Sequence, residues 1–148
     1  MMGEVDLVER AERLGRKRSQ IFFALAMVFF AGQSIYFGAP EATRDSPPRV
    51  GAWLILVCLM LLLLGTGGFL LSGRKVRDLL NDESARANRL AAQAVGFWAT
   101  ILALMAVYIE SMFDPVTLNE AVHIVGTIGV GAALISFAVR ERRAHRLG

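Results

Sequence analysis

The sequence predicts an all-α membrane protein, a four-helix transmembrane bundle that runs up-down-up-down with both termini in the cytoplasm. Three observations lead to this fold class. Four apolar blocks contain no Asp, Glu, Lys or Arg, and each is close to the roughly 20 residues that a helix needs to cross a bilayer. Turn-forming or charged segments separate the blocks. Lys and Arg are concentrated in the segments that an alternating bundle places on one side of the membrane. The predicted spans are residues 20–38, 50–71, 90–109 and 121–139.

The N-terminal segment, residues 1–18, is charged and carries Leu7, Ala11 and Leu14 at helical spacing. This pattern predicts a short cytoplasmic amphipathic helix at the membrane surface, with a solvated helical tail as the alternative. The first span follows at once. We disfavour a cleaved signal peptide, because the apolar block is long and the bulky Phe37 stands where a small residue is needed.

The second span is preceded by a linker, residues 39–49, that contains three prolines. Proline ends one helix and delays the next. The span itself starts near Trp53, and its late glycines, residues 65–68, favour close helix contact within a bilayer.

A polar segment at the middle of the chain leads into the third span. Asp82 and Glu83 suit the first turn of a helix, where the helix dipole favours negative charge, and Asp82 and Arg86 form a favourable i,i+4 pair. Together with Arg89, these residues are the candidate contact for a partner or for headgroups, and Arg86, Arg89 and the basic tail could bind anionic lipid headgroups or an acidic partner. The alternative is that the basic residues only fix the topology.

The third helix has two faces. One is small or polar and is predicted to face other helices; it comprises Asp82, Arg86, Arg89, Gln93, Gly96, Thr100 and Ala103. The other is mostly bulky and is predicted to face lipid; it comprises Ala91, Val95, Trp98, Leu102, Met105 and Ile109.

The fourth helix begins with a capping box, Thr117 at the N-cap and Glu120 three residues later. Small residues recur along it, and with those of the third helix they are predicted to pack helices, within one chain or between copies. The candidate packing residues of the two helices are Gly96, Thr100, Gly126, Gly129, Ala133 and Ser136. Leucine at Gly129 is expected to disrupt the bundle.

The distribution of Lys and Arg sets the predicted orientation. The N-terminal tail, the central loop and the C-terminal tail carry 14 of the 16 basic residues, whereas the 39–49 loop carries two and the 110–119 connection none. Basic residues in short loops remain in the cytoplasm. The expected organisation is therefore a cytoplasmic segment 1–18, a transmembrane domain 19–140 and a basic cytoplasmic tail 141–148.

Few residues suggest chemistry. His123 lies near Glu110, Asp114 and Glu120 in the sequence, which allows a metal or proton site, but an interfacial histidine at a helix start is favoured because no ligand spacing is present. Cys58 is the single cysteine. We predict no catalytic residue, no metal and no cofactor. The net charge of +3 belongs to residues that flank the spans, so no nucleic acid partner is expected.

Residues 78–146 contain an Asp-Glu pair, an Arg-containing helix entering a Gly-Phe-Trp span, and a capped last helix that ends in Arg-Glu-Arg-Arg. This half of the chain resembles small four-helix membrane proteins of bacteria to which no activity is assigned. The resemblance implies a location in the bacterial inner membrane.

The predicted function is a non-catalytic multi-pass membrane protein that packs helices and binds membrane partners or lipids, as a homo-oligomer or with another membrane protein. The alternative is a small oligomeric permease or efflux subunit. The spans carry no Asp, Glu, Lys or Arg in their middle, which argues against a proton-coupled pump. A lipid-modifying enzyme ranks third, with Asp114, Glu120 and His123 as its only candidate site.

Overall fold

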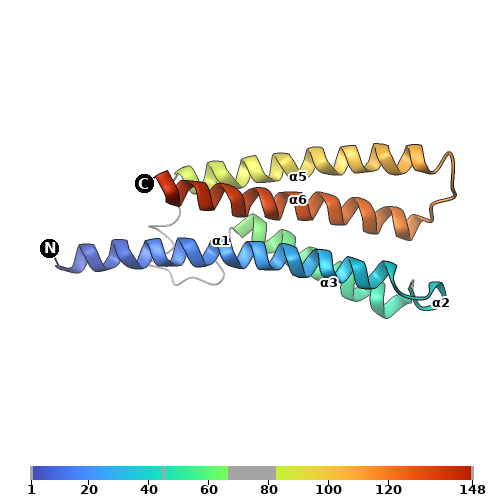
Figure 1. The fold of residues 1–148 in the computed structure, drawn as a ribbon, viewed down its shortest axis with the longest axis horizontal. Helices are drawn as coiled ribbons and strands as arrows, with labels where there is room; N and C mark the ends of the chain where they lie inside the picture. Colours follow the sequence, from blue (N-terminus) through green and yellow to red (C-terminus); the bar gives the residue numbers. More distant parts are fainter. Residues whose placement is uncertain (1, 45, 67–82, 148) are drawn as a thin grey trace.

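The computed structural model of the chain describes residues 2–44, 46–66 and 83–147, and these residues form helices and connections (Figure 1). Four of the helices are long. The elements in chain order are α1 (Met2–Phe37), the short α2 (Glu41–Arg44), α3 (Pro47–Thr66), α5 (Glu83–Glu110) and α6 (Leu118–Leu147).

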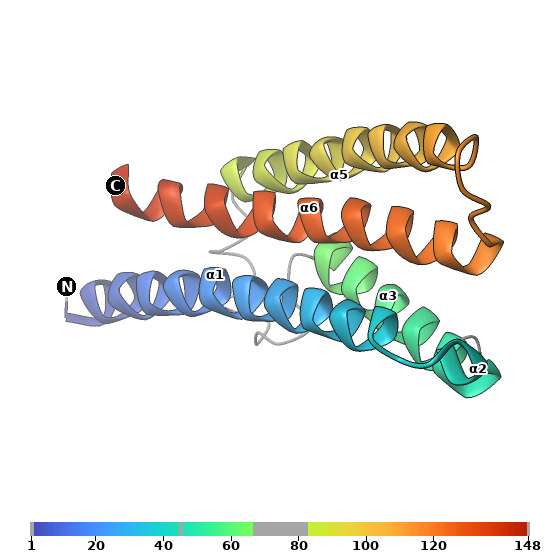
Figure 2. The same ribbon diagram turned by 45° about the vertical axis from the view of Figure 1, so that its right-hand side comes forward.

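Helix α6 is the centre of the arrangement. It contacts α5, α1 and α3, and Figures 1 and 2 show α5 on one side of it and α1 with α3 on the other. Half of the apolar window Leu118–Arg143 is buried, against 11% of Pro47–Thr66. The small residues of α6 explain this position, because they let neighbouring backbones approach on several faces.

The chain direction reverses from each long helix to the next, so both termini lie at the same end of the molecule (Figures 1 and 2). We call this the terminal end. The opposite end carries α2 and the α5–α6 connection, and we call it the hairpin end. The ends of the molecule therefore differ in charge, since Arg140, Arg142 and Arg143 lie near the terminal end.

Helices α1, α3, α5 and α6 each contain a segment that is long and apolar enough to cross a membrane. This finding confirms the predicted all-α fold with four membrane-length helices. The membrane-length segments are Ser19–Phe37, Pro47–Thr66, Arg86–Glu110 and Leu118–Arg143. Their ends lie within four residues of the predicted ends wherever the predicted end falls in the described residues. Residues 67–71 of the predicted second span lie outside the described residues.

The N-terminal segment differs from the expected separate surface helix. Residues 2–18 continue into the first span as one 36-residue helix, α1. At about 1.5 Å per residue this helix is on the order of 50 Å long, well beyond the roughly 30 Å hydrocarbon core. No proline interrupts it before Pro40. The first half of α1 therefore continues the axis of the apolar segment Ser19–Phe37 (Figure 1).

The helix ends follow from local chemistry. The N–H of Gly38 donates to the carbonyl oxygen of Ser34 at 3.0 Å, and Pro40 follows after α1 has ended. The predicted capping box of α6 is confirmed: the N–H of Glu120 donates to Thr117 Oγ1 at 3.3 Å, and the N–H of Thr117 donates to the Glu120 carboxylate at 3.1 Å.

Aromatic and apolar side chains from α1 and α6 form the core, to which α3 contributes Met60 and Leu64. Phe22 and Phe137 meet edge to face with ring centroids 4.7 Å apart, and both are buried. Near them the Ser19 hydroxyl donates to the carbonyl oxygen of Ala138 at 2.9 Å. This contact fixes α1 against the terminal part of α6.

Candidate functional site

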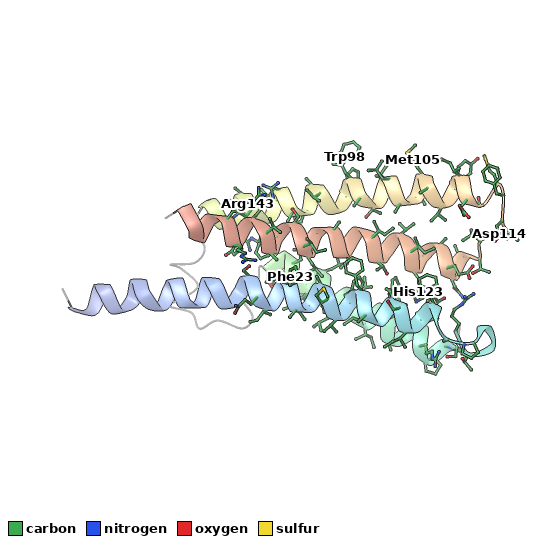
Figure 3. All side chains as sticks on the ribbon, in the orientation of Figure 1. Phe23, Trp98, Met105, Asp114, His123 and Arg143 are labelled. Carbon is green, nitrogen blue, oxygen red and sulfur yellow. The ribbon has the colours of Figure 1, made fainter. Side chains whose placement is uncertain are left out.

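A groove lies between α5 and α6 toward the terminal end. It has a volume of about 470 Å³, and its lining residues are Asn88, Ser136, Val139, Arg140 and Arg143. Figure 3 shows Arg143 on this part of α6. The groove is open on one side and offers two guanidinium groups, an amide and a hydroxyl to a ligand.

The helical repeat brings these groups together. Ser136, Arg140 and Arg143 follow one another at steps of four and three residues, so they share one face of α6. The Arg140 Nε–H group donates to Ser136 Oγ at 3.4 Å. Guanidinium groups present several N–H donors in a planar fork that suits phosphate and carboxylate oxygens. The groove is therefore suited to an anion.

Three of the four predicted contact residues, Glu83, Arg86 and Arg89, lie in the first two turns of α5, the helix that contributes Asn88 to this groove. Asp82 lies outside the described residues, and Glu83 is the first residue of α5. Arg86 is exposed and Arg89 is half-buried. The lining residue from this segment is Asn88. Sequence reasoning included the basic tail among the possible headgroup contacts but did not place Arg140 and Arg143 beside Asn88, although an antiparallel α5–α6 hairpin puts the start of α5 against the end of α6.

The structure brings four of the six predicted packing residues into one α5–α6 contact. A Cβ atom at Gly129 would lie 2.0 Å from Thr100 Oγ1, and one at Gly96 would lie 2.7 Å from Ala133 Cβ. The two backbones can approach this closely because glycine has no side chain. The other two residues have different surroundings. Gly126 faces the ring of Trp53, with a Cβ atom there only 2.9 Å from the indole, and Ser136 lines the groove.

The two predicted faces of α5 are also present. Trp98 and Leu102 are exposed, and Figure 3 shows Trp98 and Met105 pointing away from α6. Ala103 is buried on the opposite side. Gln93 was predicted on the inner face and is exposed, while its neighbour Ala92 is buried. The inner face is thus formed by small apolar side chains at this level, which suits contact with α6.

A second cluster surrounds His123 near the hairpin end. The imidazole is buried and stacks on Tyr36 of α1, with ring centroids 3.9 Å apart and an angle of 8° between the planes. Trp53 of α3 lies on it with centroids 4.2 Å apart. Nδ1 of His123 is 2.9 Å from the carbonyl oxygen of Asn119. This ring therefore joins three helices.

The acidic residues near His123 in sequence do not form a site with it. Glu110 and Asp114 are exposed, and Figure 3 shows Asp114 on the α5–α6 connection while His123 lies toward α1. Glu120 bonds to Thr117 and pairs with Arg44 of α2. Within the described ranges, no three His, Cys, Asp or Glu side chains are placed to hold a metal ion.

Glu120 has two structural roles, since it caps α6 and forms the ion pair that fastens α2 to it. Arg44 also lies over the ring of Tyr36, 5.8 Å from its centroid. Changing Glu120 to Ala removes both the capping carboxylate and the ion pair, and is expected to lower the free energy of unfolding by about 1–2 kcal/mol. Unfolding by SDS titration in mixed micelles measures this. Glu110→Ala, at an exposed carboxylate, is the control, and an equal loss from both variants would contradict these roles.

Comparison of the chain with models of known protein families, with curated proteins and with solved structures found no match. The chemistry of the groove and of the His123 cluster is therefore the basis for a functional assignment.

Proposed function

We propose that this chain is a non-enzymatic multi-pass protein of the bacterial inner membrane that binds anionic membrane components at its cytoplasmic end. In this proposal the four helices cross the membrane up-down-up-down and both termini are cytoplasmic. Four membrane-length apolar helices support the spans, and the alternating chain direction in Figure 1 supports the order.

The charge distribution supports the orientation. The N-terminal tail, the central loop and the C-terminal tail together carry 14 of the 16 basic residues. The termini lie at one end of the molecule. Because basic segments remain in the cytoplasm, the terminal end is the cytoplasmic end. The groove with Arg140 and Arg143 then opens at the inner leaflet.

The groove is the single observation on which the binding role depends. Arg143 is the last residue of the membrane-length segment of α6, so the groove lies at the level of lipid headgroups. Arg140 and Arg143 offer donors for a phosphate, Asn88 and Ser136 add neutral polar groups, and Val139 is apolar. An anionic phospholipid presents phosphate and apolar chain together, so it is the ligand that we propose.

The close contact of α5 with α6 supports helix packing over the permease alternative. A transport path along α5 would need a solvated inner face, and here Gly96 and Gly129 leave no room even for a Cβ atom. Cysteines placed at Thr100 and Ala103 in a Cys58→Ala background are therefore expected to stay protected from a polar thiol reagent.

The lipid proposal is tested by changing both groove arginines to glutamine. The protein is placed in nanodiscs of phosphatidylcholine with a minor fraction of phosphatidylglycerol, and the anionic lipid that it retains is measured by native mass spectrometry. At about 1 kcal/mol for each arginine near the membrane surface, Arg140→Gln with Arg143→Gln is expected to weaken retention on the order of thirtyfold.

Arg142→Gln is the matched control, because it removes the same charge from the neighbouring position, which does not line the groove. It is expected to retain most of the lipid. Equal loss from Arg142→Gln and from either single groove variant would show that only the overall charge of the tail matters, and would overturn the groove as a specific site.

A further inference from the structure

Five buried polar atoms near the hairpin end have no hydrogen-bond partner among the described residues, and one of them, Arg44 Nε, belongs to the guanidinium group that pairs with Glu120. The other four are Gln33 Oε1 on α1, Trp53 Nε1 on α3, and His123 Nε2 and Thr127 Oγ1 on α6. The side chains of His123, Gln33 and Thr127 are only 2%, 6% and 6% exposed. Unpaired polar groups are unfavourable in a membrane interior, where water cannot satisfy them from outside.

These atoms belong to two adjacent helical turns of the molecule. Tyr36 stacks on His123, and Phe30 lies against Gly131, since a Cβ atom there would be 2.3 Å from its ring. The two contacts show that the antiparallel helices α1 and α6 stay in contact over these turns, with lower residue numbers on α1 matched to higher numbers on α6. Gln33 lies between the first and second of these contacts on α1, and Thr127 lies between them on α6, so the two face each other at the same height.

Trp53 brings the third helix to the same place. Its ring lies on His123 and covers Gly126, the residue just before Thr127. Figure 3 shows His123 between α6 and α1. Helices α1, α3 and α6 thus each contribute a buried polar group without a partner to this part of the bundle.

The donor and acceptor character of these groups is defined. A carbonyl oxygen only accepts, so the His123 Nδ1–H group donates to Asn119, and Nε2 of the neutral ring is an acceptor. Gln33 Oε1 is an acceptor, Trp53 Nε1–H is a donor, and the Thr127 hydroxyl can do either. The cluster therefore offers two acceptors, one donor and one adaptable hydroxyl.

We infer that these four groups form a binding site for one neutral hydroxyl group, that of a water molecule or of a small alcohol. The bound oxygen accepts from Trp53 Nε1–H and from the Thr127 hydroxyl, and its protons are donated to His123 Nε2 and Gln33 Oε1. A water molecule makes all four bonds, and an alcohol makes three.

Replacing Thr127 by valine tests the site, because the two side chains have nearly the same shape. If a ligand bonds to the hydroxyl, Thr127→Val breaks a satisfied hydrogen bond and lowers the thermal unfolding temperature in nanodiscs. If no ligand binds, the variant removes an unsatisfied buried group and raises that temperature. Thr66→Val is the matched control, since the Thr66 hydroxyl bonds to Leu62 of its own helix at 2.8 Å, and it is expected to change the temperature less.

The indole N–H resonances give an independent readout, because the chain has two tryptophans and Trp98 is 63% exposed on the outer face of α5. A cross-peak from the Trp53 indole proton to water protons identifies bound water. A cross-peak to carbon-bound protons of added ethanol identifies an alcohol. Either cross-peak supports the site if it disappears in the Thr127→Val variant and is not observed for the Trp98 indole proton. A raised unfolding temperature in Thr127→Val, with neither cross-peak at Trp53, overturns it.

Discussion

Replacement of Gly129 by leucine is expected to force α5 away from α6 and to lower the free energy of unfolding by about 3 kcal/mol or more. A Cβ atom at this position already lies 2.0 Å from Thr100 Oγ1 and 3.2 Å from Thr100 Cβ. A different rotamer of Thr100 would move its Oγ1 atom away from the new side chain, but the Cβ atom of Thr100 would stay in place. The larger side chain therefore has no space unless the helices separate. Reversible unfolding by SDS titration in mixed micelles measures the loss.

Gly32→Leu is the matched control, because a Cβ atom at Gly32 meets nothing within 4 Å. It makes the same chemical change on an exposed part of α1 and is expected to leave stability nearly unchanged. A rescue experiment localises the conflict: Thr100→Ala is expected to recover much of the stability lost in Gly129→Ala, as coupled neighbours do. Equal stabilities of the two leucine variants would show that the α5–α6 contact does not hold the helices together.

Most of the correct predictions came from patterns among residues that are close together in the sequence. Hydropathy and the 3.6-residue repeat placed the spans and the outer face of α5, because both depend only on neighbouring residues. The capping box at Thr117 was readable for the same reason. The small residues Gly96 and Gly129 could be assigned to a helix contact, but not to each other, since that requires the relative position of two helices.

What could not be predicted depends on the rotation of whole helices. His123 was compared with the acidic residues close to it in sequence, whereas its neighbours in space, Tyr36 and Trp53, come from helices distant in sequence. On α5, Ala92 is buried and Gln93 is exposed. The helix is therefore rotated about its axis relative to the predicted inner face, and a pattern of polar residues alone does not define that rotation. The continuous α1 shows the same limit, because a change in composition near residue 18 does not end a helix.

Replacement of His123 by alanine is expected to lower the free energy of unfolding by about 2–4 kcal/mol. The imidazole is 2% exposed and lies against the rings of Tyr36 and Trp53, so its loss leaves a cavity where α1, α3 and α6 meet. Helix α3 is the helix most affected, because only 11% of its membrane-length segment Pro47–Thr66 is buried. SDS titration measures the loss, and Trp53 fluorescence in a Trp98→Phe background reports whether α3 has moved.

Val122→Ala is the control for this substitution, because it shortens the adjacent side chain of α6, which is 46% exposed, and it is expected to cost much less. His123→Phe separates packing from hydrogen bonding, since it keeps a ring between Tyr36 and Trp53 but removes both ring nitrogens. If stacking holds the three helices together, phenylalanine retains more stability than alanine and Trp53 fluorescence stays native. If His123→Ala and His123→Phe lower the free energy of unfolding equally, the ring nitrogens, and not the stacked ring, hold this end of the bundle together.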